Sequence, residues 1–509
     1  MTAVAGTNLA RLNEEAFERR GDYQSIFYEG RWHSSGELFE RSCRLAGGLI
    51  ELGIEAGERV AVCMANCPEV TLSYQALWRA GAVVTPAMFL LSPEDLRHVI
   101  ADSEASAVIT TPEFVDKVRD AVAPLDHVRH VISTESPDGA TNGAVSLDAL
   151  EESDPAPIAP RGDDDLAVLL YTGGTTGRAK GVMISHASLN FTGHAVQQAA
   201  HVEGVTRALM TLPLAHAYGI LITISGLHTP ERPVTVLLRW FDPGTFLSMV
   251  QEHEVQTAPL VPSMIQMLLA QPLEEFDLSS LRYLGSGAAP LAPELVDELR
   301  RRVPWVSIRQ GYGLSETAAL VSTNPAGREK PGSVGLPIPG TEVRILDDFG
   351  RTLGTGEPGE VCVRTPAVMQ GYWRAPEATA EAVRDGWLHT GDIGYLDDEG
   401  YLFIVDRKKD LIIRGGFNVY PRDVEDALLE HPAVAAAGVV GRPDARRGEE
   451  VVAFVSLNAP NAVSGEELVT WARERIGGYK YPREVYIVEA IPLTAVGKLD
   501  RKALRARLL

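Results

Sequence analysis

The strongest constraint on the fold is an alternation between helical and extended patterns that starts near the N-terminus. Each helical pattern is flanked by short apolar runs, and the blocks cover residues 35–52, 59–64 and 68–80; 82–86, 92–101 and 107–110; and 234–237, 243–254 and 257–261. This rhythm is typical of layered α/β proteins. At 509 residues the chain is also too long for one compact domain. We therefore expect an α/β fold with a large layered N-terminal body and at least one further domain.

Later changes of pattern indicate where the chain divides. A stretch rich in Ser, Gly, Asp and Pro over 137–160 is expected to be an exposed connection. Past Thr341 the apolar period shifts toward two, which predicts strands at 342–346 and 359–364 in a β-rich subdomain. A strand expected at 401–405 then meets the charged segment Asp406-Arg-Lys-Lys-Asp410. Beyond this boundary, helices at 422–430 and 466–476 and strands at 435–440 and 450–457 predict a small α+β domain.

A glycine and threonine loop follows the apolar run 166–171 and reads Tyr171-Thr-Gly-Gly-Thr-Thr-Gly-Arg-Ala-Lys-Gly181. Such a loop suits a phosphate, because glycines let backbone N–H groups approach an anion, while hydroxyls add donors and a lysine adds charge. These residues are Gly173, Gly174 and Gly177; Thr172, Thr175 and Thr176; and Lys180. Since Lys180 follows Ala179 and precedes Gly181, the loop departs from the kinase and GTPase pattern G-x-x-x-x-G-K-[ST]. Taken alone, it is also compatible with a flexible surface loop.

Composition excludes several classes of protein. The net charge of -21 argues against nucleic acid and against an anionic membrane surface, because both partners call for a basic field. No apolar run approaches the roughly 20 residues of a membrane helix, and Arg11, Glu14 and Glu15 stand where a signal peptide needs an apolar core. The four cysteines provide no disulfide framework for a chain this long. We therefore expect a soluble protein of a reducing compartment, the cytoplasm.

Several separated segments fit one pattern, and the chain resembles the adenylate-forming (AMP-binding) superfamily, particularly its acyl-CoA synthetases. The resemblance covers nearly the whole chain, and the motifs stand in the family's order. Besides the loop at 171–181, they are Pro213-Leu-Ala-His-Ala-Tyr-Gly219, Gly285-Ser-Gly-Ala-Ala289, Gly311-Tyr-Gly-Leu-Ser-Glu-Thr317, Thr390-Gly-Asp392, Asp406-Arg-Lys-Lys-Asp410 with Gly415-Gly416, and Pro492-Leu-Thr-Ala-Val-Gly-Lys498. One such match is weak, whereas the ordered set is specific.

The resemblance implies a first step in which a carboxylate attacks the α-phosphate of ATP. Because both reactants are anions, cations and backbone donors are required. The resemblance assigns the loop with Thr172, Thr175, Thr176 and Lys180 to the β- and γ-phosphates, Thr317 to the α-phosphate and Glu316 to Mg²⁺. It assigns Asp392 with its partner Arg407 to the ribose. The residues that it assigns to the adenine slot and its surroundings are Gly287, Ala288, Ala289, Gly311, Tyr312 and Gly313. Taken alone, Glu316 is also compatible with a carboxylate at the start of a helix.

The resemblance implies a second step in which the CoA thiol attacks the acyl-adenylate and AMP leaves. In this family the small domain rotates between the steps, which implies a body over 1–405, a hinge over 406–410 and a mobile C-terminal domain over 411–509. Lys498 would bridge the carboxylate and the α-phosphate, whereas Lys409 would act in the hinge. Gly415 and Gly416 would flank the pantetheine arm of CoA. His216 would orient the acid without acting as a base, because a carboxylate is already ionised at neutral pH.

We therefore expect an ATP-dependent acid–CoA ligase that uses ATP, Mg²⁺ and CoA. A neutral apolar acid, fatty or aromatic, is the expected substrate, because no extra Arg or Lys falls in the pocket segments, and a bulky specialised-metabolite acid stays open. A homodimer also stays open. Two alternatives remain. The first is an enzyme that only forms acyl-AMP or only transfers a supplied acyl-AMP to CoA. The second, of another class, is a catalytically silent acyl- or nucleotide-binding module on the same fold.

Overall fold

The computed structural model describes residues 8–135, 141, 143–172, 178–444, 446–494 and 499–508. The chain forms two compact units: Met1–Glu342 with Val363–Leu388, and Val343–Cys362 with His389–Leu509. Helices and strands alternate through the first unit, which confirms the predicted α/β class. Within the described parts of the chain, every helix is too short or too polar to traverse a lipid bilayer.

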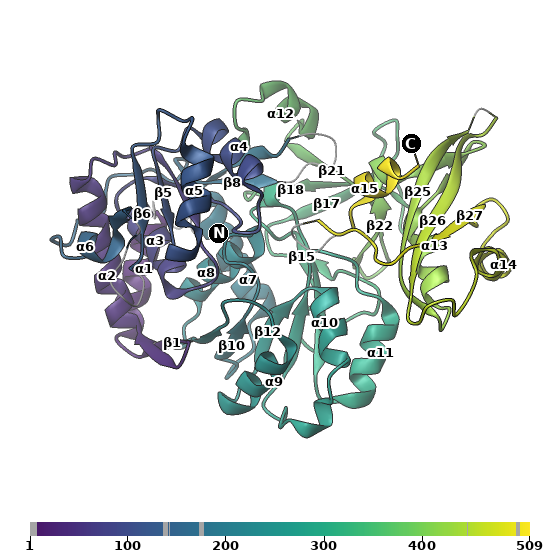
Figure 1. The fold of residues 1–509 in the computed structure, drawn as a ribbon, viewed down its shortest axis with the longest axis horizontal. Coiled ribbons are helices and arrows are strands. Elements are labelled where there is room, and N and C mark those ends of the chain that lie inside the picture. Colours follow the sequence, from purple (N-terminus) through teal and green to yellow (C-terminus); the bar gives the residue numbers. More distant parts are fainter. Residues whose placement is uncertain are drawn as a thin grey trace. The chain divides into compact units, whose positions relative to one another are not determined.

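The first unit contains an eight-stranded sheet in the order β19-β9-β8-β4-β3-β5-β6-β7. Its strands β5, β6 and β8 are labelled in Figure 1. Its strands are β3 Arg59–Cys63, β4 Val83–Pro86, β5 Ala107–Thr110, β6 His130–Ser133, β7 Val145–Ser146, β8 Leu166–Thr172, β9 Lys180–Ser185 and β19 Gly371–Tyr372. The strands from β8 to β7 pair in parallel, whereas β9 and β19 run antiparallel to their neighbours. Along β3, Val60 and Val62 join one core cluster, while Ala61 and Cys63 join another. Because side chains alternate between faces, the sheet is buried on both sides.

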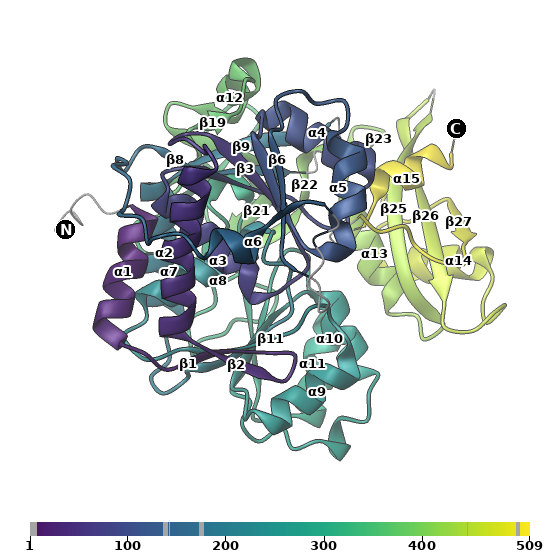
Figure 2. The ribbon, with the colours of Figure 1, turned by 60° about the vertical axis from the view of Figure 1, so that its left-hand side comes forward.

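Helices cover both faces of this sheet, and Figure 2 shows α1 and α2 on the opposite side from α4 and α5. The helices on the first side are α1 Leu9–Arg20, α2 Ser35–Glu51 and α3 Pro68–Arg79. Those on the second side are α4 Pro93–Ser103 and α5 Val115–Val122, which follows the 3-10 turn η1 Pro112–Phe114. The connection expected over 137–160 contains, in its described part, β7 and the short helix α6 Leu147–Leu150. Ser146 begins this helix by accepting a hydrogen bond from the Ala149 N–H (3.0 Å).

A nine-stranded sheet in the order β16-β15-β14-β13-β12-β10-β11-β1-β2 completes the first unit. Its strands are β1 Gln24–Tyr28, β2 Arg31–Ser34, β10 Arg207–Met210, β11 Val234–Leu237, β12 Thr257–Leu260, β13 Tyr283–Ser286, β14 Ser307–Tyr312, β15 Ser322–Thr323 and β16 Leu336–Pro337. Leu209 and Val236 face a core formed with α9 Pro243–Glu252, α10 Pro262–Leu269 and α11 Pro293–Arg302. The next residues, Met210 and Leu237, face the core that contains α7 His186–Ala200 and α8 Ala217–His228. The strands β10 to β14 are parallel, so their carboxyl ends share one edge, where ligands commonly bind.

The second unit holds most of a five-stranded sheet and all of another. The first has the order β17-β18-β21-β20, with β22 paired to β21, and its strands are β17 Glu342–Leu346, β18 Gly359–Arg364, β20 Val383–Arg384, β21 Trp387–Leu396 and β22 Leu402–Arg407. The second has the order β24-β23-β26-β25, with β27 paired to β26, and its strands are β23 Ile412–Arg414, β24 Phe417–Val419, β25 Val434–Asp444, β26 Gly448–Leu457 and β27 Glu484–Ile487.

The faces of the second sheet are separated by the alternation of side chains along β26. Val451, Ala453 and Val455 pack with α13 Pro421–Leu429 and α14 Gly465–Arg475, whereas Val452 and Phe454 pack with Leu504 of α15 Arg501–Ala506. This arrangement matches the small α+β domain predicted after residue 410. The remaining short elements are α12 Pro376–Ala382 and the 3-10 turns η2 Leu273–Glu275, η3 Ser315–Thr317 and η4 Lys408–Asp410.

Candidate active site

The glycine and threonine loop connects two antiparallel strands of the first unit. Thr172 ends β8 and lies opposite Lys180, the first residue of β9. Gly181 is closely packed, because a Cβ there would lie 2.9 Å from Cδ1 of Leu169 and would require that side chain to shift. The loop residues Gly173, Gly174, Thr175, Thr176 and Gly177 lie outside the described residues, as does Lys498. The described ends of the loop thus place a threonine and a lysine side by side at the mouth of a hairpin.

Glu316 is held next to this hairpin by a tyrosine. The hydroxyl of Tyr372, on β19, donates a hydrogen bond to Oε1 of Glu316 (2.8 Å). The Lys180 ammonium lies 5.1 Å from the centroid of the same ring, within cation–π range. The N–H of Met369 fixes the backbone of Glu316 by donating to its carbonyl (2.9 Å). Lys180 and Glu316, predicted from separate motifs, are therefore brought together around one aromatic ring.

The turn that carries Glu316 is tightly constrained. A Cβ at Gly313 would lie 1.8 Å from the carbonyl oxygen of Ala319, so only glycine fits. Ala318 and Ala319 follow the turn with φ of 47° and 88°, a left-handed backbone that non-glycine residues rarely adopt and that clusters at functional sites. The buried hydroxyl of Thr317 donates to the Leu314 carbonyl (3.0 Å). The turn thus fixes Glu316 and Thr317, and contact of Thr317 with the α-phosphate stays a prediction.

The carboxyl end of β13 brings together the segments predicted for the acid and for adenine. A Cβ at Gly285 would lie 3.0 Å from the hydroxyl of Tyr218, and one at Gly287 would lie 3.5 Å from Cε1 of that ring. Burial raises the pKa of Tyr218, with a further contribution from Tyr283, so the phenol stays neutral. Ala288 next to Gly287 has φ of 67°, another left-handed alanine. A neutral aromatic face therefore lies against glycines at the edge where ligands of α/β sheets bind.

The remaining residues predicted around adenine lie on or beside the neighbouring strand. Gly311 and Tyr312 end β14 and pair with β15, opposite Thr323 and Ser322. The N–H of Val321 donates to the Tyr312 carbonyl (2.8 Å). Ala289, on the loop after β13, is half-buried. The pairing of β14 with β13 and β15 fixes the backbone of Gly311 and Tyr312 beside the end of β13, and their contact with adenine stays a prediction.

His216 caps helix α8 at its N-terminus. Its Nδ1 accepts a hydrogen bond from the backbone N–H of Tyr218 (3.3 Å). When the imidazole is neutral, this acceptor role puts its proton on Nε2. The flanking Ala215 and Ala217 are buried small residues. His216 is therefore oriented by its own helix, as a positioning residue should be.

In the second unit, Asp392 and Arg407 lie opposite each other on β21 and β22. Nε of Arg407 contacts Oδ1 of Asp392 at 2.9 Å. The Asp392 side chain is only 5% exposed, whereas that of Arg407 is 43% exposed. The N–H of Asp392 also donates to the hydroxyl of Thr390 (3.1 Å). The pair predicted from two motifs is thus confirmed as a contact, with a buried carboxylate and a half-exposed guanidinium.

The predicted hinge, 406–410, comprises the last two residues of β22 and the 3-10 turn η4, and its acidic residues are anchored. Asp406 is buried and accepts a hydrogen bond from the N–H of Arg422 (2.9 Å). Burial raises the pKa of Asp406, and the positive charge of Arg501 partly offsets this effect. Asp410 contacts Arg505 at 2.8 Å, while Lys409 between them is exposed. The anchored acids leave Lys409 directed to solvent, and its role in a hinge stays a prediction.

Gly415 and Gly416 form the turn between β23 and β24, apart from the Asp392 pair. Their φ angles are 59° and 84°, which glycine adopts without strain. A Cβ at either position would meet nothing within 4 Å among the described atoms, so the backbone conformation and not lack of space selects glycine. The Gly415 N–H donates to the Arg447 carbonyl (2.8 Å). Their predicted place beside pantetheine is compatible with this open surface.

Sequence reasoning did not assign roles to Tyr218, Tyr372 or Ser286. Tyr218 and Ser286 stand inside two of the motifs, Pro213–Gly219 and Gly285–Ala289. Their position in a motif, together with an aromatic or hydroxyl side chain, could have predicted a role in the site. The buried Ser286 hydroxyl has no hydrogen-bond partner among the described residues, so it is available to a ligand at the end of β13. Tyr372 had no such signal, because its contact with Glu316 depends on the pairing of β19 with β9.

Comparisons with known proteins identify the family of this chain. The AMP-binding enzyme family matches residues 13–373, and the AMP-binding enzyme C-terminal domain matches residues 423–498. A feruloyl-CoA synthase of an Amycolatopsis species is 40% identical over 476 residues, covering 92% of this chain and 93% of that protein. A long-chain-fatty-acid–CoA ligase of Bacillus subtilis (strain 168) is 35% identical over 529 residues, covering 97% and 94%. An ATP-bound crystal structure of MatB from Rhodopseudomonas palustris has a TM-score of 0.89 at 31% identity, covering 98% of this chain and 99% of that one.

The fold and the motif residues define an adenylate-forming enzyme, with a layered α/β body and a small α+β region after it. The chain belongs to the AMP-binding enzyme family. The motifs predicted a resemblance to the acyl-CoA synthetases of this family. Relatives named as a CoA synthase and a CoA ligase confirm it, because this chain matches them over most of their length.

Proposed function

We propose that this protein is an ATP-dependent acid–CoA ligase that completes two steps. In the first, a carboxylate oxygen of the acid attacks the α-phosphorus of ATP, and pyrophosphate leaves. In the second, the sulfur of CoA attacks the acyl carbonyl, AMP leaves, and a thioester forms. The observation that carries this proposal is the arrangement of Lys180, Tyr372 and Glu316, because it sets a cation and a carboxylate beside the mouth of the phosphate-type loop.

The residues of the first unit suit the charges of the first step. The acid and ATP repel each other, so their approach requires positive charge and fixed donors. Lys180 supplies a point charge, and Thr172 beside it supplies a hydroxyl. Glu316 is half-buried and offers carboxylate oxygens, the ligand type that Mg²⁺ prefers, so it fits the role of metal ligand. When bound there, Mg²⁺ would neutralise charge on the phosphates.

Asp392 and Arg407 suit the ribose of ATP. A carboxylate accepts hydrogen bonds from both hydroxyls of a diol, and the guanidinium fixes its orientation. Lys498 would bring positive charge to the carboxylate and the α-phosphate in the first step. For the second step, a turn of the small domain about Lys409 would bring Gly415 and Gly416 to the arm of CoA.

We propose a neutral aromatic acid of the ferulate type as the substrate. The relative named feruloyl-CoA synthase, 40% identical, supports this choice. The fatty-acid ligase among the relatives makes long-chain fatty acids the comparison to include.

The test is an acid-dependent exchange of labelled pyrophosphate into ATP, followed by detection of the CoA thioester. Ferulate, related cinnamates, benzoates and fatty acids form the panel. Exchange and thioester formation with at least one acid are expected, with the highest kcat/KM for an aromatic acid. The absence of both reactions across the whole panel would contradict the proposal.

Synthetic acyl-AMP separates the complete enzyme from one that performs a single half-reaction. A complete ligase both forms thioester from supplied acyl-AMP and exchanges pyrophosphate, whereas a partial enzyme does only one of these.

Lys498→Ala separates a ligase from a silent binding module. We expect adenylation to fall by about a hundredfold or more while ATP binding is kept, since preorganised charge at a reacting centre is worth this much. An unchanged exchange rate in this variant would contradict the assigned role of Lys498.

A further inference from the structure

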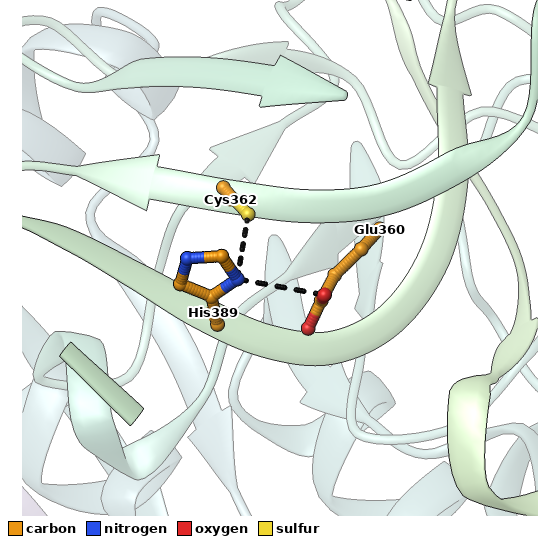
Figure 3. Close-up of side chains that lie close together, drawn as sticks. All are labelled: Glu360, Cys362 and His389. Atoms are coloured by element: carbon orange, nitrogen blue, oxygen red, sulfur yellow. Dashed lines mark hydrogen bonds and ion pairs between the residues drawn. The ribbon is translucent and has the colours of Figure 1, made fainter. Parts of the chain in front are cut away.

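Three metal-binding side chains, none of them assigned to ATP, meet in the second unit. Glu360 and Cys362 lie on β18, and His389 lies on β21, which is the next strand in the sheet. Because side chains alternate along a strand, Glu360 and Cys362 share one face. Figure 3 shows the imidazole of His389 between the sulfur of Cys362 and the carboxylate of Glu360. The sheet pairing thus assembles a thiol, an imidazole and a carboxylate.

Two of the three separations between these atoms match those around a zinc ion. Nδ1 of His389 lies 3.4 Å from Sγ of Cys362 and 3.4 Å from Oε2 of Glu360. All three ligand atoms lie within 4.8 Å of one another. Tetrahedral Zn²⁺ with bonds of about 2.0–2.3 Å puts neighbouring ligand atoms about 3.3–3.6 Å apart. The cluster therefore needs little rearrangement to bind one ion with three protein ligands.

The cluster is also shielded from solvent. Cys362 is fully buried, and the side chains of His389 and Glu360 are 16% and 14% exposed. The hydroxyl of Thr390, beside His389, donates to the Val361 carbonyl (2.7 Å), so the two strands are already fixed at this point. A fixed, shielded set of S, N and O ligands suits Zn²⁺, whereas Mg²⁺ prefers oxygen ligands alone.

A second group, Asp397, Asp398 and Glu399, offers a useful contrast. These residues occupy the turn between β21 and β22, and Oδ1 of Asp397 already accepts hydrogen bonds from the N–H groups of Glu399 and Tyr401. Two of the three are exposed, and all three provide only oxygen. The turn itself accounts for this cluster, so we assign no ion to it.

Lys408 is the natural competitor for the cluster. Its ammonium lies 3.2 Å from Oε2 of Glu360, the same oxygen that faces His389, and 3.2 Å from Oδ1 of Asp348. The Lys408 side chain is 42% exposed and stands on a flexible stem. It can therefore keep Asp348 and release Glu360 when another cation arrives. Removing Lys408 should strengthen metal binding, whereas removing a ligand should weaken it.

We propose that Glu360, Cys362 and His389 form a Zn²⁺ site whose fourth position is taken by water. Binding would release the thiol proton of Cys362 to solvent and join β18 to β21 on the strand that continues to Asp392. The site is distinct from the Mg²⁺ position proposed at Glu316. It does not depend on the acid–CoA ligase activity, because the ligands lie on other residues and binding can be measured without substrates.

The first test uses Co²⁺ as a spectroscopic probe of the full-length protein after treatment with a chelator. We expect a near-ultraviolet thiolate-to-cobalt band together with the visible bands of a tetrahedral site, both lost when excess Zn²⁺ is added. Cys362→Ser should abolish the thiolate band. Cys43→Ala, which changes another buried cysteine, should keep it. A wild-type protein without the band would overturn the proposal, whatever the variants do.

The second test measures Zn²⁺ affinity by competition with a chromophoric chelator. His389→Gln should bind Zn²⁺ at least about tenfold more weakly than wild type, as even the loss of a supporting contact costs about 10- to 100-fold. Lys408→Met should bind several-fold more tightly. Circular dichroism without metal checks that each variant is folded. Equal affinities of wild type, His389→Gln and Lys408→Met would overturn the site even if Zn²⁺ binds elsewhere on the chain.

Discussion

Glu316 and Asp392 are both carboxylates assigned to the nucleotide, yet their partners differ in charge. Oε1 of Glu316 accepts a hydrogen bond from the neutral phenol of Tyr372 (2.8 Å), whereas Oδ1 of Asp392 meets the guanidinium of Arg407 (2.9 Å). A carboxylate held by a neutral donor keeps its net negative charge, which suits a cation. One held by a guanidinium belongs to a neutral pair, whose remaining lone pairs suit hydroxyl donors. The two partners thus suit the metal-binding role proposed for Glu316 and the ribose-binding role proposed for Asp392.

The largest effect is expected from Glu316→Gln. Glutamine keeps the size of the side chain and an oxygen for Tyr372, but it removes the charge. We expect kcat for pyrophosphate exchange to fall by about 10²- to 10³-fold, because charge stabilisation at the transferred group is lost. The Mg²⁺ concentration for half-maximal rate should rise as well. A normal Mg²⁺ dependence would break the assignment of this carboxylate to the metal.

Asp392→Asn tests the other carboxylate. We expect the KM for ATP to rise by about 10- to 100-fold, since a hydrogen bond to a charged group is worth about 1.5–3 kcal/mol. Wild type should discriminate against 2′-deoxy-ATP, and the variant should lose that discrimination. Asp347→Asn is the matched control, because Asp347 pairs with Arg351 (2.7 Å) in an exposed turn. If wild type and Asp392→Asn discriminate equally between ATP and 2′-deoxy-ATP, the assignment of Asp392 to the ribose is wrong.

Tyr372→Phe tests the neutral partner of Glu316. The variant keeps the ring beside Lys180 and removes one hydrogen bond, so kcat should fall by about tenfold. Tyr486→Phe is the control, because its hydroxyl donates to Glu484 (2.6 Å) on the exposed strand β27. If both variants retain wild-type kcat, the phenol does not set the position of Glu316.

The smallest effect concerns the pH dependence of stability, to which one buried group in each unit should contribute in opposite directions. Burial lowers the pKa of His186 in the first unit to about 4, with a further contribution from Arg161. The unfolded histidine, with a pKa of about 6.5, takes up its proton first, so stability is lost as pH falls from about 6.5 to 4, by about 2 kcal/mol at pH 5. In the second unit, burial raises the pKa of Glu425 to about 7 despite the charge of Arg501. Because the folded state holds the proton of Glu425 more tightly than the unfolded state does, Glu425 contributes to stability at low pH. This contribution is lost as pH rises through about 7.

Hydrogen exchange at pH 5 and pH 7.5 resolves these responses. Peptides from α7, which begins at His186, should exchange faster at pH 5 after correction for intrinsic rates, whereas peptides from α13 should be protected. His186→Asn keeps an acceptor for the Leu9 N–H and should reduce the response of α7. A uniform response of both helices in wild type would show that these buried groups do not control it.

Local patterns predicted the elements well where both burial and turn signals are strong. The strands expected at 107–110, 342–346 and 359–364 are β5, β17 and β18, with the same bounds. The helix expected at 68–80 is α3, whose start is set by Pro68 in its first turn. The short helix α6 was not predicted, since only Ser146 and one turn of helix signal it inside a polar stretch.

Long-range pairing was beyond the sequence. Asp392 and Arg407 were predicted as partners by resemblance, but the register that makes them face each other follows from β21 and β22. In the structure, residues 389–405 belong to the same compact unit as the chain after residue 410. The charge pattern of the sequence indicated a boundary only at 406–410. Tyr372 reaches Glu316 because β19 adds to the edge at β9, with Gly371 opposite Met183. No local pattern encodes such a contact between distant segments.

Transfer of oxygen from the acid to AMP tests the central claim most directly. Both carboxylate oxygens of the acid are labelled with a heavy oxygen isotope, and the acid is turned over with ATP, Mg²⁺ and CoA. Mass spectrometry then measures the masses of the products. If the carboxylate attacks the α-phosphorus, one labelled oxygen appears in AMP and the thioester keeps the other. Unlabelled AMP, or label in orthophosphate with ADP as the other product, would contradict adenylation as the chemistry of this enzyme.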